Sequence, residues 1–472
     1  MTRNQRLLAA LAAATAALTL TTSASAAPAA PTAVEPPSPL AAGWTQGTPV
    51  AQAPGVTRTV WTEKTPNNRP LGARVLQVVE IDTAVAPVVL GSTVGSDDAS
   101  SQTVLDQLGT VSVVDARRPS VGVNGGLFQA ERPIGTAEPR VVHTSATAVD
   151  GVLHSAACWE RGKGSTGAVL QYGIPYITEL ATELRLTSSD GSSVRVDDIN
   201  RNPGRVPHCE RDAEDVMATD KPRVYKDADE VVVFTDDYGP ETPKPYTDPA
   251  VPATADPGYE VVLDAHGVVL DAHPGRGGST VPEGGRIVQG VGSGATWLRE
   301  HLVRDDRAVL DQKLRDMTLG RDIPLDASVD VVSSFHRLLT AGSLPSPAPT
   351  NSCNDGTSVG NDGQPICTDS RTALATNIKG NTVLLTLTGG PGREDGDYLR
   401  DFATLIDSKE LGLVDALNLD GGGSTTLVTG KETATPPTDP GPGGTDVHRK
   451  VADAVFAGTG GYGMYAKPPK TK

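Results

Sequence analysis

Aromatic residues, positive charge and long apolar runs are all scarce in this sequence. Phe, Trp and Tyr make up 4% of its 472 residues, whereas Gly (51) and Pro (37) are frequent. That composition favours short strands and turns over long helices. The formal net charge of -16 argues against a nucleic-acid partner, because a phosphate backbone requires a basic surface.

The first 26 residues have the pattern of a secretory signal peptide. Arg3 and Arg6 precede an apolar run from Leu7 to Leu20, and Ala24-Ser25-Ala26 supplies small residues for cleavage. The run is shorter than the roughly 20 residues that a membrane-spanning helix needs, and no later segment could span a bilayer. We therefore expect a secreted, extracellular protein without a membrane span.

A Pro- and Ala-rich linker is expected to follow the signal peptide. Residues 27–42 contain little else, so they cannot bury enough apolar surface to order themselves. Residues 43–69 are interpreted as an added strand or arm. The catalytic domain is expected to occupy residues 70–472.

The four cysteines predict disulfides rather than a metal site. An even number of cysteines in an exported chain is typical of disulfide bonding, and three pairings are possible. We favour Cys158 with Cys209, and Cys353 with Cys367. Zinc is the rival interpretation, but the chain has no C-x-x-C pair and no histidine at ligand spacing.

Strand patterns outnumber helix patterns along the chain. Residues 75–81, 230–235 and 415–419 are rich in Val, Ile and Leu and predict strands, and the β-branched run at 111–114 predicts another. Residues 398–411 carry apolar side chains at helical spacing. The sequence therefore predicts an α+β fold with mixed or antiparallel sheets, few helices and a single catalytic domain.

The most distinctive motif is a predicted strand that ends in a carboxylate and three glycines. It comprises Asn418, Asp420, Gly421, Gly422 and Gly423, followed by Ser424 and Thr425. Glycines cost backbone entropy, so we interpret the run as a nest of bare N–H groups that could bind phosphate beside Asp420. The alternative is a flexible turn between two elements.

Two weaker motifs carry polar groups at strand ends. Asn124 is followed by Gly125 and Gly126, and Asn124 could bind a sugar hydroxyl or orient a carboxylate, although a type I′ hairpin explains Asn-Gly equally well. Arg371 lies at the start of a predicted strand. There it could form a bidentate hydrogen bond to a phosphate, or an ordinary surface salt bridge.

In their order and spacing, these motifs resemble the phosphodiester glycosidase family from about residue 70 to 466. The matching segments are Asn124–Phe128, Ile199–Arg201, Thr235–Gly239, Arg371–Ala373, Asn418–Thr426 and Arg449–Val451. The chain departs from the family at Asp369-Ser370, where the family usually has His-Pro, at Gly389–Arg393, and at Asp453, where Asn is usual.

The resemblance implies a hydrolase that cleaves the glycosidic bond of a sugar-1-phosphodiester, either a small sugar phosphate or a wall polymer. Asp420 would be the nucleophile, base or oxocarbenium stabiliser, and Arg371 would hold the phosphate. Asn124 and Asn200 would bind or orient the sugar. The motifs do not identify a second catalytic carboxylate, and Asp369 is the candidate for it. The alternative is a non-catalytic polysaccharide-binding protein of the same fold.

No cofactor is expected, although a structural calcium site is a third hypothesis. Residues 351–362 contain Asn351, Asn354, Asp355, Asn361 and Asp362, which could supply oxygen ligands. The run lacks the spacing of an EF-hand loop, and polar turns explain it equally well.

Overall fold

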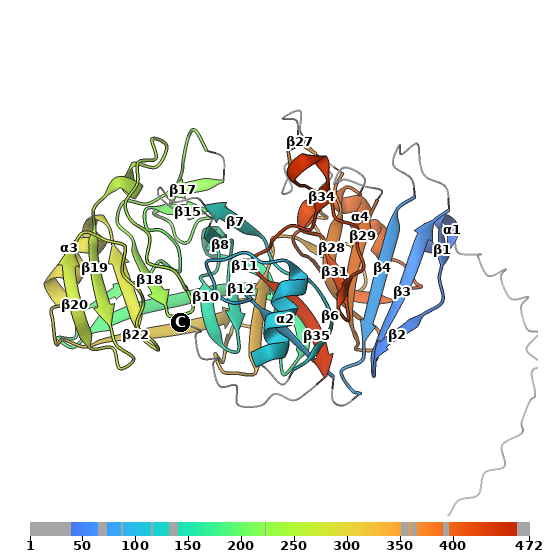
Figure 1. The fold of residues 1–472 in the computed structure, drawn as a ribbon, viewed down its shortest axis with the longest axis horizontal. Coiled ribbons are helices and arrows are strands. Elements are labelled where there is room, and N and C mark those ends of the chain that lie inside the picture. The colour runs from blue at the N-terminus through green and yellow to red at the C-terminus, as the bar shows by residue number, and fades with distance from the viewer. Residues whose placement is uncertain are drawn as a thin grey trace, which may run out of the picture. The chain divides into compact units, whose positions relative to one another are not determined.

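The protein is built mainly from antiparallel sheets with four helices among the residues that the structure describes (Figure 1). The computed structural model describes residues 39–64, 73–85, 88–114, 117–131, 140–221, 223–350, 358–359, 365–366, 368–389 and 396–459. Within them, every strand pair except β14 with β18 is antiparallel. The chain from Ser38 onward forms one compact unit. The predicted α+β fold with mixed or antiparallel sheets and few helices is confirmed.

The first sheet contains two of the motif-bearing strands. Its order is β1-β3-β4-β29-β28-β30-β25, with β2 paired to β3. Residues 44–63, interpreted from the sequence as an added strand or arm, form its first three strands. The strands are β1 (Trp44–Gln46), β2 (Val50–Ala53), β3 (Val56–Glu63), β4 (Val75–Ile81), β25 (Arg337–Leu339), β28 (Arg371–Asn377), β29 (Thr382–Thr388) and β30 (Leu413–Asn418).

A second, five-stranded sheet shares a hydrophobic core with the first. Val79 and Leu384 of the first sheet pack in one cluster with Val123 and Val455 of the second, and all four side chains are at most 1% exposed. Its order is β32-β31-β6-β35-β5. The strands are β5 (Val88–Thr93), β6 (Pro119–Asn124), β31 (Leu427–Thr429), β32 (Glu432–Thr433) and β35 (Ala454–Thr459).

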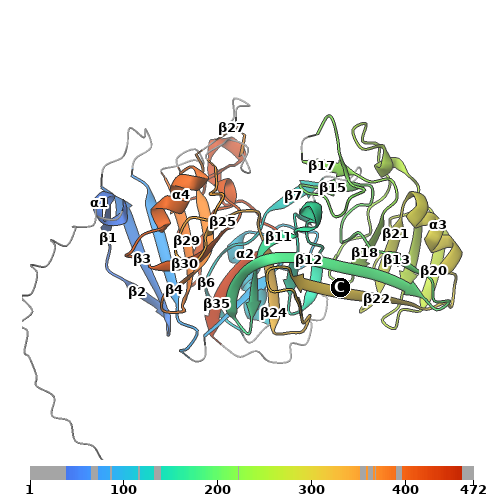
Figure 2. The same ribbon diagram turned by 180° about the vertical axis from the view of Figure 1, so that it is seen from behind.

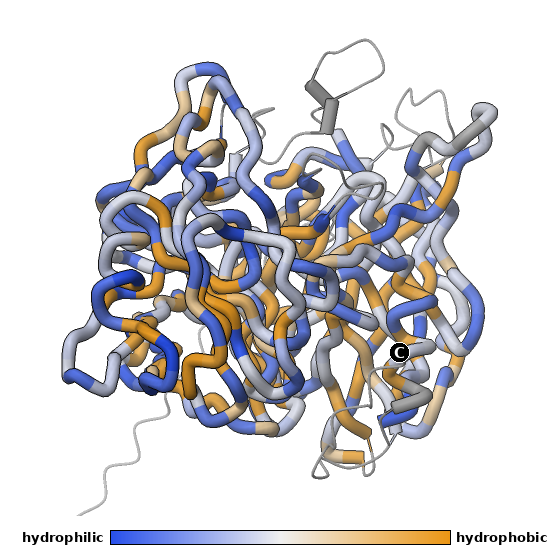
Figure 3. Tube along the Cα trace, turned by 60° about the vertical axis from the view of Figure 1, so that its left-hand side comes forward, coloured by the Kyte–Doolittle hydropathy of each residue, from blue (hydrophilic) through white to orange (hydrophobic). Residues whose placement is uncertain are grey.

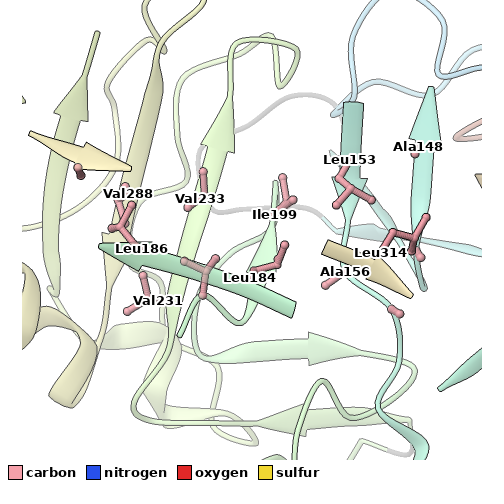
Figure 4. Close-up of a cluster of buried hydrophobic side chains, with 14 of the residues drawn as sticks. Ala148, Leu153, Ala156, Leu184, Leu186, Ile199, Val231, Val233, Val288 and Leu314 are labelled. Atoms are coloured by element: carbon pink, nitrogen blue, oxygen red, sulfur yellow. The ribbon is translucent and has the colours of Figure 1, made fainter. Parts of the chain in front are cut away.

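The third sheet is organised around the long strand β12, which curves across the view in Figure 2. Leu184 and Leu186 of β12 contribute to the cluster drawn in Figure 4 together with Val231, Val233 and Val288 of a neighbouring sheet. The strands are β9 (Thr147–Val149), β10 (Val152–Ser155), β11 (Ser165–Gln171), β12 (Ile174–Ser188), β13 (Ser193–Arg195), β22 (Ala308–Asp316), β23 (Arg321–Ile323) and β24 (Val329–Ser333).

The neighbouring sheet and several short ladders complete the strands. The neighbouring sheet has the order β14-β18-β21-β19-β20, with strands β14 (Asp198–Ile199), β18 (Val231–Thr235), β19 (Tyr259–Leu263), β20 (Val269–Pro274) and β21 (Arg286–Gly290). The short ladders are β15 (Arg205–Pro207), β16 (Val216–Met217) and β17 (Val224–Lys226); β7 (Phe128–Glu131) and β8 (Arg140–His143); β26 (Ser358–Val359) and β27 (Pro365–Ile366); β33 (Asp439–Pro440) and β34 (Asp446–Val447).

The helices are α1 (Pro39–Gly43), α2 (Val104–Val114), α3 (Gly292–His301) and α4 (Leu399–Ile406). The strand predicted at 111–114 is wrong, because α2 continues through it. Val104, Leu108 and Val111 lie on one face of the helix and pack against Phe456, and that tertiary contact outweighs the strand preference of the β-branched residues. No helix among the described residues is long and apolar enough to cross a bilayer. In Figure 3 the outer loops are mainly hydrophilic.

The predicted disulfide between Cys158 and Cys209 is present, with 5.6 Å between the two Cα atoms. It joins the loop between β10 and β11 to the segment that follows β15. The two cysteines are 51 residues apart in sequence. The other predicted pair, Cys353 with Cys367, and the polar run at 351–362 lie outside the described residues, apart from the two residues of β26.

Candidate active site

The glycine triplet lies where the chain passes from the first sheet to the second. β30 ends at Asn418, and β31 begins at Leu427 beside β6. The antiparallel partner of β30 is β28, so the end of β30 and the start of β28 lie together, with Ala373 opposite Asn418. Asp420 therefore lies at the meeting point of three strand ends, those of β6, β28 and β30.

Asn124 holds these three strand ends together. Its Nδ2 donates to the carbonyl oxygen of Asp420 at 2.7 Å, and its Oδ1 accepts from the Thr372 hydroxyl at 2.8 Å and from the Thr426 N–H at 3.1 Å. The side chain is fully buried. Of the two roles considered for Asn124, these contacts favour orienting the Asp420 segment over binding a sugar hydroxyl.

The three glycines do not form the nest of bare amides that the sequence suggested. The Gly421 N–H donates to the carboxylate of Asp420 at 3.0 Å, and the Gly422 N–H donates to the Ser370 carbonyl at 2.8 Å. Only the Gly423 N–H has no partner in the described part of the chain. The glycines meet local steric requirements instead, since a Cβ on Gly421 would lie 2.8 Å from the Ser370 oxygen and Gly422 has a φ of +60°.

The guanidinium of Arg449, a residue with no role predicted from the sequence, lies over this turn. Nη1 of Arg449 donates to the Ser424 hydroxyl at 3.3 Å, and its Nη2 pairs with the carboxylate of Asp439. A Cβ on Gly423 would lie 2.5 Å from Nη2 of Arg449, so this position must be glycine for the guanidinium to pack there. The sequence does contain this arginine in the family-like segment Arg449–Val451. Because Arg449 is far from Asp420 in the sequence, the motif alone does not predict that the two lie together.

The surroundings of Asp420 raise the pKa of its carboxyl group toward neutral pH. Burial, with a smaller contribution from the charge of Asp369, raises the pKa of Asp420 to about 6, against the hydrogen bond from Ser424 and the charge of Arg449, which lower it. For Arg449, burial alone would lower the pKa, but the hydrogen bond to Asp439 and the charge of Asp420 raise it above its ordinary value. Asp420 is therefore a group that ionises close to neutral pH.

Several buried polar atoms around the turn have no hydrogen-bond partner within the described chain. They are the hydroxyl oxygens of Ser370, Thr425 and Thr426 and the Oδ1 of Asn418. Most buried polar groups in proteins are hydrogen-bonded, so a gathering of unpartnered ones needs a functional or solvent explanation. At a turn beside a carboxylate and a guanidinium, hydroxyl and amide groups of this kind suit a hydroxyl-rich ligand.

Arg371 lies at the start of β28, where its Nε is held by the backbone of a neighbouring segment. Its Nε donates to the carbonyl of Asp397 at 2.9 Å, and its side chain is largely buried. Asp397 also pairs with Arg74 at 2.6 Å and lines a cavity of about 460 Å³ together with Trp44 and Glu63. Asp420 does not line that cavity. Arg371 therefore links the Asp420 turn to a neighbouring polar cavity.

Gly125 and Gly126 are required by close approach rather than by a hairpin. β6 pairs with β31 and β35, and β7 pairs with β8, so Asn124-Gly125 does not close a type I′ hairpin. A Cβ on Gly125 would lie 2.6 Å from the buried carboxylate of Asp453, and one on Gly126 would lie 2.4 Å from the Ser333 carbonyl. Burial raises the pKa of Asp453.

Asn200 belongs to a separate buried network. Its Nδ2 donates to Asp98 at 2.7 Å, and its Oδ1 accepts from the Thr235 N–H at 2.9 Å. The same Asp98 contacts His143 at 2.9 Å and His154 at 3.3 Å. This network acts on the buried Asp453, beside Gly125, through the charges of His143, Asp98 and His154. Sequence spacing gives no sign that His143 and His154 share one carboxylate.

Residues 258–457 match the family model of phosphodiester glycosidases. The match confirms, for this segment, the family resemblance that the motifs indicated. The matched segment contains Arg371, Asp420 and Arg449. The motifs at Asn124 and Asn200 lie before it in the sequence. No curated protein matches the chain.

Solved structures share the fold. A crystal structure of a protein from Burkholderia pseudomallei aligns with a TM-score of 0.71 and 21% identity, covering 89% of this chain and 98% of that one. A hypothetical protein from Synechocystis aligns with a TM-score of 0.55 and 16% identity, over 85% of this chain and 62% of that one. At these identities the likeness shows the fold alone. The catalytic domain of zebrafish N-acetylglucosamine-1-phosphodiester alpha-N-acetylglucosaminidase aligns at 12% identity over 88% of this chain and 87% of that one, but its TM-score of 0.37 supports no inference.

Proposed function

We propose that this chain is a hydrolase that cleaves the glycosidic bond of a sugar-1-phosphodiester, with Asp420 as the catalytic carboxylate. The observation that carries the proposal is the position of Asp420. A carboxylate with a pKa raised to about 6 lies beside a guanidinium, on a turn fixed by three strand ends, within a segment that matches the phosphodiester glycosidase family. Such a carboxylate is largely ionised at neutral pH and sits next to a cation suited to a phosphate.

The reaction requires little acid catalysis. Water adds to the anomeric carbon and gives up a proton to a base or to solvent, the bond from that carbon to the phosphate oxygen breaks, and the phosphate monoester leaves as an anion. Because the leaving group is already stable, positioning and charge stabilisation do most of the work. Asp420 acts as nucleophile, as base for the water, or as the stabiliser of positive charge at the anomeric carbon.

The groups around Asp420 divide between the two halves of the substrate. Arg449, the Gly423 N–H and Ser424 are proposed to hold the phosphate, so Arg449 takes the role first assigned to Arg371. Asn418 and Thr425 have buried polar atoms without partners in the described chain and are proposed to bind sugar hydroxyls. Asn124 and Asn200 are proposed as positioning residues, because their side chains bond within the protein.

Replacement of Asp420 with Asn is the decisive experiment. The amide keeps the shape of the side chain but cannot act as nucleophile or base, so release of sugar from a sugar-1-phosphodiester should fall by at least about 10²- to 10⁴-fold. Thermal unfolding of the variant should match that of the wild type. Near-normal turnover by a folded Asp420→Asn protein would disprove the assignment.

A second proposal is that the protein binds a wall polymer or exopolysaccharide without cleaving it. Its motivation is that Asp369-Ser370 replaces the usual His-Pro and that Nε of Arg371 is bonded to Asp397. The two proposals differ in one measurement. Incubation of wild-type protein with purified polymer should release phosphorylated product if the protein is a hydrolase, and should give saturable binding without product if it is not.

Export from the cell is also proposed. The disulfide between Cys158 and Cys209 supports it, because disulfides persist in oxidising compartments. Recovery of the processed protein, lacking residues 1–26, from the medium of producing cells is the expected result.

A further inference from the structure

We propose that Asp212, Asp215 and Asp227 form a calcium site, remote in sequence from the Asp420 turn. One carboxylate oxygen from each residue lies within 4.8 Å of the corresponding oxygens of the other two. Two oxygens on opposite sides of a calcium ion, at about 2.4 Å each, are about 4.8 Å apart, so all three fit one coordination sphere.

The site joins two loops beside the disulfide. Asp212 and Asp215 lie in the segment between β15 and β16, just after Cys209, and Asp227 follows β17. The three residues are between 7% and 9% exposed, so their carboxylates do not have the hydration that makes surface acidic clusters common. Val216 pairs with Lys226, so Asp215 and Asp227 flank the same end of the small three-stranded ladder, and a bound ion would tie the two chain segments together there.

Asp215 provides a second and separate observation. It is more than nine-tenths buried, and its Oδ1 has no hydrogen-bond partner within the described chain. Its Oδ2 accepts the N–H of Arg211 at 2.5 Å, which fixes the direction of the carboxylate. A buried carboxylate oxygen without a partner is costly unless a cation or a proton occupies it.

The local charge balance favours a divalent cation. Three arginines neutralise part of the surrounding negative charge: Arg201 pairs with Asp198 and Glu230, Arg211 with Asp198, and Arg195 with Asp212. Asp215 and Asp227 form no ion pair among the described residues. Two buried carboxylates are thus left without a cationic partner.

The ligand chemistry selects calcium among divalent ions. The three side chains offer only oxygen, which excludes the nitrogen and sulfur environment that zinc prefers. Magnesium keeps most of its water and demands a regular octahedron, whereas calcium accepts several carboxylates in an irregular shell and completes it with carbonyl oxygens and water.

The test uses the full chain, freed of metal with EDTA and then desalted. Calorimetric titration with calcium chloride should show saturable binding at one site. At a calcium concentration 100 times the Kd, Tm should rise by about 3–5 °C. No saturable binding at millimolar calcium, or tighter binding of magnesium than of calcium, would overturn the proposal.

A double variant and a matched control locate the ion. Asp215→Asn with Asp227→Asn should weaken calcium binding at least about tenfold and leave the metal-free Tm equal or higher, because the amides relieve repulsion between buried charges. Asp271→Asn with Asp311→Asn, at exposed residues of β20 and β22, removes the same two charges and should bind calcium as the wild type does. Retention of wild-type affinity by the double variant would place the ion elsewhere and refute the site.

Arg195→Gln tests the same site without touching a proposed ligand. Nη1 of Arg195 lies 2.6 Å from Asp212, and the Arg195 side chain is 48% exposed, so the protein should fold without it. Removing this competing cation should tighten calcium binding several-fold. An unchanged affinity would contradict the proposal even if the double variant failed to fold.

Discussion

Replacing Arg449 with Gln should weaken substrate binding and shift the pH dependence of the reaction in a single change. Arg449 contacts Ser424 beside Asp420 and lowers the pKa of that carboxylate. A hydrogen bond from a guanidinium to a phosphate contributes about 1.5–3 kcal/mol, so kcat/KM should fall by about 10- to 100-fold. A cation within about 6 Å lowers a carboxyl pKa by about one unit or more, so its removal should raise the pKa of Asp420 from about 6 toward 7.

The pH profile separates these two effects. Because Asp420 acts in its ionised form, kcat/KM should rise with pH through the pKa of the free enzyme, near 6 in the wild type. In Arg449→Gln the rising limb should move to higher pH, so the loss of activity should be larger at about pH 5 than at about pH 8. Lys450→Gln removes the same charge from the exposed neighbouring residue and should change neither quantity. Wild-type kcat/KM together with an unshifted limb in a folded Arg449→Gln protein would refute this account of the site.

Three further changes test the framework around the site. Replacing Cys158 and Cys209 with Ala should lower the free energy of unfolding in urea by about 2–4 kcal/mol, because a constraint across 51 residues is removed from the unfolded chain; an unchanged midpoint would contradict this. Asn124→Ala should lower it by about 2–4 kcal/mol, since three hydrogen bonds are lost and their partners stay buried, and a cost below about 1 kcal/mol would argue against the proposed positioning role. Gly423→Ala should displace Arg449 and lower kcat/KM by up to about 10- to 100-fold, as Arg449→Gln does, with Tm nearly unchanged, while Gly109→Ala in α2, where a Cβ meets nothing within 4 Å, should leave activity intact; equal activities would show that the guanidinium does not depend on this glycine.

Buried strands are the part of the fold that the sequence predicted best. The strand expected at 75–81 is β4 with the same bounds, and the one expected at 230–235 is β18, which starts one residue later. All five residues of β18 are buried, so its continuous run of apolar residues is a strong signal. The helix expected at 398–411 is shorter, because the backbone of Asp407 leaves the helical region after Ile406. Helix ends depend on capping and on tertiary contacts, and periodicity alone does not define them.

The sequence did not predict which residues from distant segments contact one another. Asn124 and Asp420 are 296 residues apart, yet one hydrogen bond joins them. His143 and His154 meet on Asp98 only because β8, β10 and the loop before α2 converge there. Local patterns identify a polar residue at a strand end, but they do not show which other strand ends meet it.

The glycine triplet shows how a motif can be recognised correctly for a reason that is only partly right. Three adjacent glycines suggested exposed amides, but two of these amides are bonded within the protein. The structure gives each glycine a steric reason instead: Gly421 admits the Ser370 carbonyl, Gly422 adopts a positive φ, and Gly423 admits the guanidinium of Arg449. Missing side chains thus let a strand end and a cation approach Asp420 more closely than any other residues would allow. A carboxylate held this rigidly beside a cation needs little reorganisation when charge develops on a substrate, which is the main physical requirement for the proposed reaction.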